Sequence, residues 1–146
     1  MSAVERALVR SGPRIAQLDR IPGGHAALVN AIERALPRLF DPEAAGDLDA
    51  SFALEIRGRR PVVRTLTVRD RRLTVSRGRP QNAGATVLVG AGDMVRLATG
   101  DTGWPALLAE GRLELAGDPF LALRFPRLFG LPAEPGTPVL LRRRDT

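Results

Sequence analysis

The chain has 146 residues, of which 44% are hydrophobic and 26% are charged, a composition that suits one globular domain with its own core. It contains no cysteine, which excludes disulfides, thiolate metal sites and cysteine nucleophiles. All 22 basic residues are arginine, and the net charge of +6 favours an anionic partner or surface.

The first 24 residues carry charges at short intervals, where a secretory signal would need an apolar stretch. No apolar run in the chain approaches the length of a membrane span. We therefore expect a cytoplasmic protein.

The first strong periodicity lies in residues 25–40, HAALVNAIERALPRLF. Its apolar residues recur at the spacing of an amphipathic helix and share one face. They are Leu28, Ile32, Ala35, Leu36 and Leu39. We expect Pro37 to break this helix. His25, the only histidine, is expected at the helix start, and a multi-histidine metal site is excluded.

After a polar linker, alternating polar and apolar residues predict β-strands at 51–57, 62–68 and 73–75, joined in a meander. In the first of these strands, Phe52, Leu54 and Ile56 should face the core. The run ATVLV at 85–89 predicts a fourth and more fully buried strand.

Nine arginines lie between Arg57 and Arg79 with a single acid, Asp70. This basic segment is expected either to dock on an anionic membrane or an acidic partner, or to be a solvated face that discourages strand pairing. Nucleic acid is disfavoured because no aromatic residue interleaves with the arginines. The candidate docking residues are Arg57, Arg59, Arg60, Arg71 and Arg72.

Two short helices are predicted next, at about 93–99 and 104–110, followed by a fifth strand with Leu113 and Leu115 facing inward. The segment Asp101-Thr102-Gly103 spells an aspartic-protease motif, but it follows a helix end, so we interpret it as a turn. Gly90-Ala91-Gly92 lacks the third glycine of a dinucleotide fingerprint.

A last helix is expected to start at Pro119, with Asp118 as its N-cap. Three of the five phenylalanines, Phe120, Phe125 and Phe129, fall here. Pro126 sits in the middle of the segment, so the helix either ends near Phe125 or kinks.

The segment ATVLVGAGDMVRLATGDTGWPALLAEGRLELAGDPFLALRFPRLFG, residues 85–130, resembles the sterol-binding domain of the sterol carrier protein 2 family. The resemblance implies an α/β (α+β) fold, with a mostly antiparallel five-stranded sheet, helices packed on one face and an apolar tunnel between them. It implies a lipid-binding domain over residues 25–131, after an N-terminal extension (1–24) and before a Pro/Gly-rich tail with a basic end (132–146).

The residues implied to line the tunnel come from the two short helices, the fifth strand and the last helix. They are Met94, Leu97, Trp104, Leu107, Leu108, Leu113, Leu115, Phe120, Leu123, Phe125, Leu128 and Phe129. Phe52, Leu54 and Ile56 would complete the sheet wall.

The expected function is a non-catalytic lipid-binding or lipid-transfer protein that holds a sterol, fatty acyl chain or prenyl lipid. The alternative is an accessory or dimerisation module that presents a lipid substrate to a partner enzyme, with a homodimer as one form. No cofactor is expected. An autonomous enzyme is disfavoured by the single histidine and the lack of cysteine.

Overall fold

The computed structural model describes residues 23–136. Residues 1–22 and 137–146, which include most of the expected extension and the basic end of the tail, lie outside the described residues. The elements along the described chain are α2 (Gly24–Leu39), α3 (Pro42–Ala45), β1 (Ala50–Arg57), β2 (Val62–Arg69), β3 (Arg72–Arg77), β4 (Ala85–Gly90), α4 (Ala91–Ala98), α5 (Trp104–Ala109), β5 (Leu113–Gly117), α6 (Pro119–Ala122) and α7 (Arg124–Leu128).

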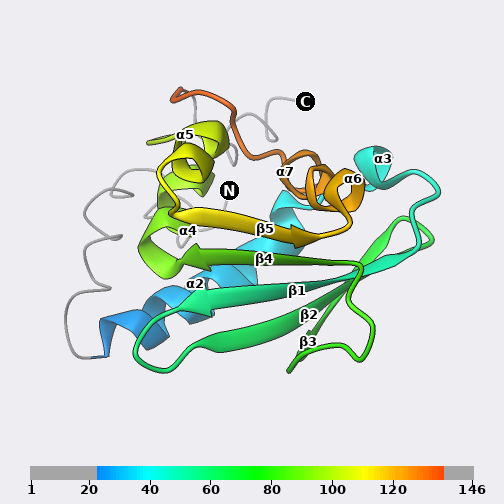
Figure 1. Ribbon diagram of the computed structural model, residues 1–146, viewed down its shortest axis with the longest axis horizontal. Helices are drawn as coiled ribbons and strands as arrows, with labels where there is room; N and C mark the ends of the chain where they lie inside the picture. Colours follow the sequence, from blue (N-terminus) through cyan, green and yellow to red (C-terminus); the bar gives the residue numbers. More distant parts are fainter. Residues whose placement is uncertain (1–22, 137–146) are drawn as a thin grey trace.

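The strands form one sheet in the order β3-β2-β1-β4-β5. Strands β1 and β4 pair in parallel, and the other neighbours pair antiparallel. In Figure 1, α2 crosses behind the sheet, and the later helices gather on its β4–β5 side. The α/β fold with a mostly antiparallel five-stranded sheet, expected from the sequence, is confirmed.

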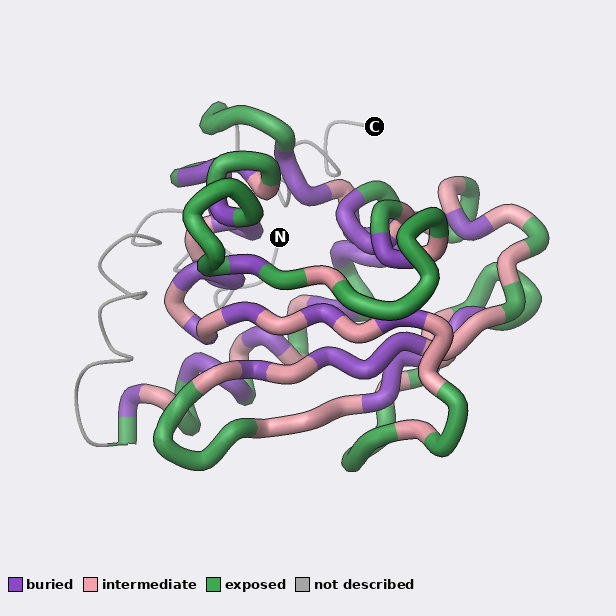
Figure 2. The backbone as a smooth tube through the Cα atoms, in the orientation of Figure 1, coloured by how far each residue is buried: buried purple, intermediate pink, exposed green. Residues whose placement is uncertain are grey.

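Alternation along the strands sends one row of side chains toward the helices. Phe52, Leu54 and Ile56 of β1 are fully buried in that row, as expected, together with Leu66 of β2 and Val87 of β4. Figure 2 shows that buried residues are concentrated in the central strands and that the turns are largely exposed. The core therefore lies between one face of the sheet and the helices.

The β3–β4 connection, residues 78–84, crosses the opposite face of the sheet. Thr65 Oγ1 donates to the Gly78 carbonyl at 2.7 Å, and Arg79 pairs with Glu55 at 2.8 Å. Both partners project from β2 and β1 away from the helices. This crossover lets β4 pair with β1 rather than with β3.

The expected break at Pro37 is wrong, because α2 continues through this residue to Leu39. Pro37 lies in the last turn, where it costs the helix one hydrogen bond to the Glu33 carbonyl. The last turn stays helical because Leu36 and Leu39 are buried in the core, at 0% and 1% exposure.

Residues 42–45, expected to be part of a polar linker, form the one-turn helix α3. Asp41 caps it by accepting from the Glu43 N–H at 3.0 Å. Arg124 of α7 donates to the Ala44 and Ala45 carbonyls at 3.1 and 3.2 Å, which satisfies the C-terminal end of α3.

The last helix starts at Pro119 as expected, and the Asp118 side chain accepts from the Phe120 N–H at 2.9 Å. It is interrupted at Leu123, which ends α6 and begins α7. Pro126 is therefore the third residue of α7. A first-turn N–H has no partner within its helix, so proline is tolerated there and the helix continues to Leu128.

Candidate functional site

The space beneath α7 is filled by aromatic rings. The ring centroids of Phe125 and Phe129 are 4.9 Å apart. The Phe52 ring of β1 lies 6.1 Å from Phe125, and the Phe40 ring lies 5.9 Å from Phe129. These separations are typical of packed aromatic pairs. Since α7 continues past Pro126, Phe125 and Phe129 belong to one wall, and side chains occupy the volume between α7 and the sheet.

An apolar cavity remains between α2 and α4. It is lined by one row of residues from each helix: Ala31, Ile32, Ala35, Leu36, Leu39, Met94, Val95, Ala98 and Thr99. Its volume is about 20 Å³, enough for about one water molecule. The helices approach closely here because three of the lining residues are alanines.

The cavity is almost without polar groups. Thr99 is the only residue with a polar side chain in the lining, and its hydroxyl donates to the Val95 carbonyl at 2.9 Å. A ligand at this position would therefore contact hydrocarbon. Thr99 lies at the end of α4, so it marks one end of the cavity.

Ion pairs fasten the outer sides of both helices to the sheet. Glu33 of α2 accepts a hydrogen bond from Arg64 of β2. Asp93 of α4 accepts from Arg112, the residue before β5, through two bonds of 3.0 and 2.7 Å. This bidentate geometry is the strong form of the carboxylate–guanidinium pair. The cavity lining between α2 and α4 is apolar apart from Thr99.

Arg96 extends this network toward the α4–α5 turn. It donates to Asp101 at 2.8 Å and to Asp93 at 3.3 Å. The hydrogen bond that Arg96 donates to Asp101 is the largest cause of the raised pKa of Arg96, so the guanidinium stays charged. Asp101 thus holds a helix-linking turn.

The residues implied to line a tunnel fall into three groups. Met94, Leu97, Leu107, Leu113, Phe125, Leu128 and Phe129 are buried, and Trp104 and Leu115 are half-buried. Leu108, Phe120 and Leu123 are exposed at 38%, 83% and 48%, so they do not line the interior. Within the implied set only Met94 borders the cavity.

The α2 side of the cavity was not predicted from the sequence. Its residues, among them Ile32, Ala35 and Leu36, were identified as an apolar helix face and not as part of a site. The available signal was the pair of alanines, Ala31 and Ala35, one turn apart on that face.

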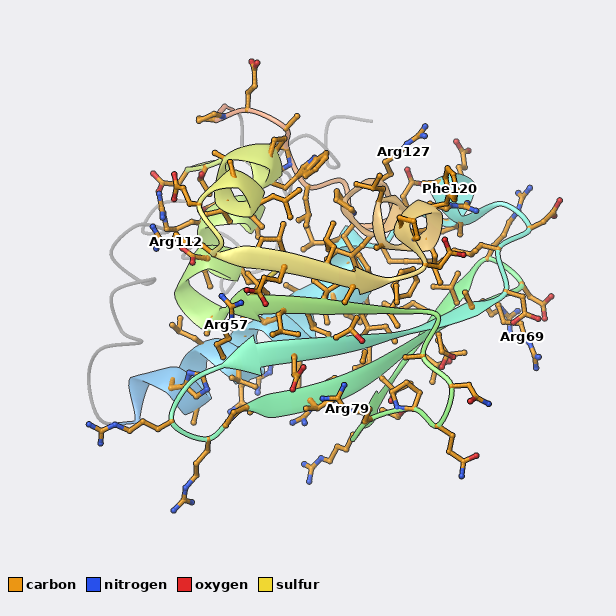
Figure 3. The ribbon with its side chains drawn as sticks, viewed as in Figure 1. Arg57, Arg69, Arg79, Arg112, Phe120 and Arg127 are labelled. Carbon is orange, nitrogen blue, oxygen red and sulfur yellow. The ribbon has the colours of Figure 1, made fainter. Side chains whose placement is uncertain are left out.

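The basic segment does not form one patch. Arg59 and Arg60 lie in the β1–β2 turn, whereas Arg71 and Arg72 lie at the β2–β3 turn, at the other end of β2. Arg57 is paired with Glu114 at 2.9 Å. Figure 3 shows Arg57 and Arg69 at opposite ends of the sheet.

No helix among residues 23–136 has both the length and the apolar character needed to cross a bilayer.

Residues 29–130 match the family model of the SCP-2 sterol transfer family. A comparison with curated proteins returned no match.

Several solved structures are similar to this chain. Sterol carrier protein 2 like 2 from Aedes aegypti is 28% identical with a TM-score of 0.55, over 70% of this chain and 97% of that one. The UbiJ-SCP2 ubiquinone synthesis protein is 21% identical with a TM-score of 0.55, over 75% and 97%. The sec-alkylsulfatase Pisa1 from Pseudomonas sp. is 21% identical with a TM-score of 0.59, over 71% of this chain and 16% of the sulfatase. This chain therefore spans a small part of the sulfatase, and the last two likenesses show the fold alone.

Proposed function

The chain belongs to the SCP-2 sterol transfer family, and from that premise we propose that it binds the hydrocarbon part of a lipid between α2 and α4 without catalysing a reaction. The apolar cavity is the observation that carries the proposal. Its lining selects for apolar shape, so a sterol, a fatty acyl chain and a prenyl lipid all suit it.

The cavity must widen to accept such a ligand. Its volume of about 20 Å³ is far below the roughly 300–1,000 Å³ of small-molecule pockets. Met94 has a flexible unbranched side chain, which makes it the lining residue best able to move aside. The ion pairs of Glu33 and Asp93 hold the outer sides of the helices, so we propose that the facing sides separate.

The buried residues beside the cavity would supply the rest of the wall. Leu97 lies on α4. Phe125 and Leu128 of α7, and Phe129 directly after it, form part of the same core cluster. We propose that these side chains repack around a bound hydrocarbon.

A substitution in the cavity wall tests this proposal. Ala35 of α2 borders the cavity and is half-buried, so Ala35→Phe should fill the space between α2 and α4. Ala27 of the same helix is exposed, so Ala27→Phe adds the same ring where it blocks nothing. We expect Ala35→Phe to weaken binding of the fluorescent fatty acid cis-parinaric acid about tenfold or more, and Ala27→Phe to leave it unchanged.

The measurement is a fluorescence titration of the full chain, repeated with the fluorescent sterol dehydroergosterol. Circular dichroism checks that each variant is folded. The proposal fails if the unaltered protein binds neither probe, or if a folded Ala35→Phe variant binds as well as the unaltered protein.

A second candidate is an accessory module that presents a lipid to an enzyme. The similarity to 16% of the Pisa1 chain supports it, because this fold there forms one part of a larger protein described as a sulfatase. The name of the UbiJ-SCP2 ubiquinone synthesis protein supports a prenyl lipid as the ligand in this role. Co-purification of an enzyme with the tagged chain from its native host would favour this candidate over a free carrier.

A further inference from the structure

Strand β5 forms an edge of the sheet, with β4 as its only strand neighbour in the described part of the chain. It pairs with β4 from Leu113 to Gly117, so its other side presents the backbone groups of an edge strand. Such an edge is a template for pairing with another strand.

The exposed large hydrophobic residues of the described chain all flank this edge. Leu108 lies on α5, which precedes β5, while Phe120 and Leu123 lie on and just after α6, which follows it. Figure 3 shows Phe120 and Arg112 at opposite ends of β5. Phe120 is 83% exposed, so the fold of one copy gains little from its ring.

Antiparallel pairing of two β5 strands about a two-fold axis would use all of these features. If the axis passes Leu115, Leu113 lies opposite Gly117 of the second copy, and Glu114 lies opposite Ala116. The start of one β5 then adjoins the end of the other. This places α6, with Phe120, beside α5 of the second copy, with Leu108.

The charges agree with this register. Continuing the pairing by one residue places Arg112 opposite Asp118 of the second copy, twice by symmetry, and both residues are exposed. Within one copy Arg112 binds Asp93 through Nε and Nη2, and Asp118 caps α6 through Oδ1, so the contact between copies would join Arg112 Nη1 and Asp118 Oδ2. Glu114 faces Ala116 rather than another acid, and it is already paired with Arg57.

The other edge of the sheet has the opposite character. Strand β3 begins at Arg72 and ends at Arg77, and both are exposed, so homotypic pairing there brings arginines together.

We propose that this chain forms a two-fold homodimer through β5, with Phe120 of each copy packed against α5 of its partner. The two sheets become one continuous sheet, and the α2–α4 cavity stays outside the interface because no cavity residue lies on β5.

Two substitutions of opposite charge at one exposed position test the register. Ala116→Asp places an acid opposite Glu114 of the second copy, and Ala116→Arg places a base there. Sedimentation velocity of the full chain should give a species near twice 15.7 kDa for the unaltered protein. We expect Ala116→Asp to weaken dimerisation about tenfold or more, and Ala116→Arg to preserve or strengthen it.

Phe120→Glu tests the apolar contact, and it should also shift the protein to the monomer. Circular dichroism and thermal unfolding show whether each variant keeps its fold, and an unaltered cis-parinaric acid affinity shows that the lipid site is separate. The proposal is overturned by a monomeric unaltered protein, by a dimer that ignores both Phe120→Glu and Ala116→Asp, or by equal effects of Ala116→Asp and Ala116→Arg.

Discussion

The Asp93 side chain joins α4 to the segment before β5 through its hydrogen bonds with Arg112. Its side chain is 11% exposed, and Arg112 and Arg96 both donate to it. Asp93→Ala would leave the guanidinium groups of Arg96 and Arg112 without this partner. Arg112 is half-exposed, so water would replace part of its lost hydrogen bonding. We expect the free energy of unfolding to fall by about 2 kcal/mol. Urea denaturation monitored by circular dichroism measures it.

Asp49→Ala is the matched control, because Asp49 is 63% exposed and lies 3.5 Å from the equally exposed Arg69. Surface pairs of this kind contribute about 0–1 kcal/mol. The loss of unfolding free energy in Asp49→Ala should therefore be less than half of the loss in Asp93→Ala. Equal losses would show that the Asp93 contacts do not fasten α4.

The β2–β3 turn stores backbone strain at two residues. Asp70 and Arg71 have φ values of 52° and 60°, the left-handed conformation that a type I′ hairpin requires at both central positions. Glycine adopts this conformation without the steric cost of a Cβ. We expect Arg71→Gly to raise the free energy of unfolding by about 0.5–1 kcal/mol.

Arg72→Gly provides the comparison, because Arg72 lies in strand β3, where glycine weakens the strand. Thermal unfolding should show a higher Tm for Arg71→Gly and a lower one for Arg72→Gly. A lower Tm for both variants would mean that the left-handed conformation of Arg71 is not a strain that glycine can relieve.

The break between α6 and α7 separates two phenylalanines that lie close together in the sequence. Phe125 is 1% exposed and packs against Phe52 and Phe129, whereas Phe120 is 83% exposed. We expect Phe125→Ala to cost about 3–5 kcal/mol of unfolding free energy, because it leaves a cavity in the core. Phe120→Ala should change it by less than about 0.5 kcal/mol.

Guanidinium denaturation at low protein concentration compares the two variants, so that self-association does not contribute. Similar losses for Phe120→Ala and Phe125→Ala would place both rings in the core and contradict the assignment of Phe120 to the surface.

The elements with a clear period were predictable from the sequence. The strand alternation of Phe52, Leu54 and Ile56 gave the correct inward face. The last helix was harder, because it is interrupted at Leu123, with Phe120 of α6 exposed and Phe125 of α7 buried. Pro37 was misjudged because the burial of Leu36 and Leu39 outweighs the local preference of proline.

The α2 side of the candidate site could not be predicted from the sequence, for a different reason. A helix face that packs in a core and one that borders a cavity have the same periodicity. Only the placement of α4 against α2 distinguishes them, and that depends on the β1–β4 pairing between distant segments.

The two turns of the basic segment lie at opposite ends of β2. Strand β2 has 8 residues, which spans roughly 26 Å, so Arg59 and Arg60 cannot share a small anionic patch with Arg71 and Arg72. Asp47, Asp49 and Asp70 lie near the β2–β3 turn and reduce its positive potential. We therefore propose that any anionic membrane is met by the β1–β2 turn.

Charge reversal of each turn tests this choice. We expect Arg59→Glu with Arg60→Glu to weaken binding to phosphatidylserine-containing vesicles about tenfold or more, and Arg71→Glu with Arg72→Glu to have a much smaller effect. Co-sedimentation with vesicles at low and high salt is the measurement, because electrostatic docking weakens as salt rises. Equal binding to neutral and anionic vesicles would rule out docking through either turn.

The parallel pairing of β1 with β4 has a consequence for kinetics. Helix α2 and the β1–β2–β3 meander come from the first part of the chain, whereas β4, α4 and α7 come from the second, and the two parts meet along the β1–β4 pairing. Contacts between such distant segments form late in folding, because long loops must close first. The α2–α4 cavity takes one helix from each part, so it exists only after the two parts have docked. A hydrocarbon ligand bound there should therefore slow the unfolding rate and leave the folding rate nearly unchanged.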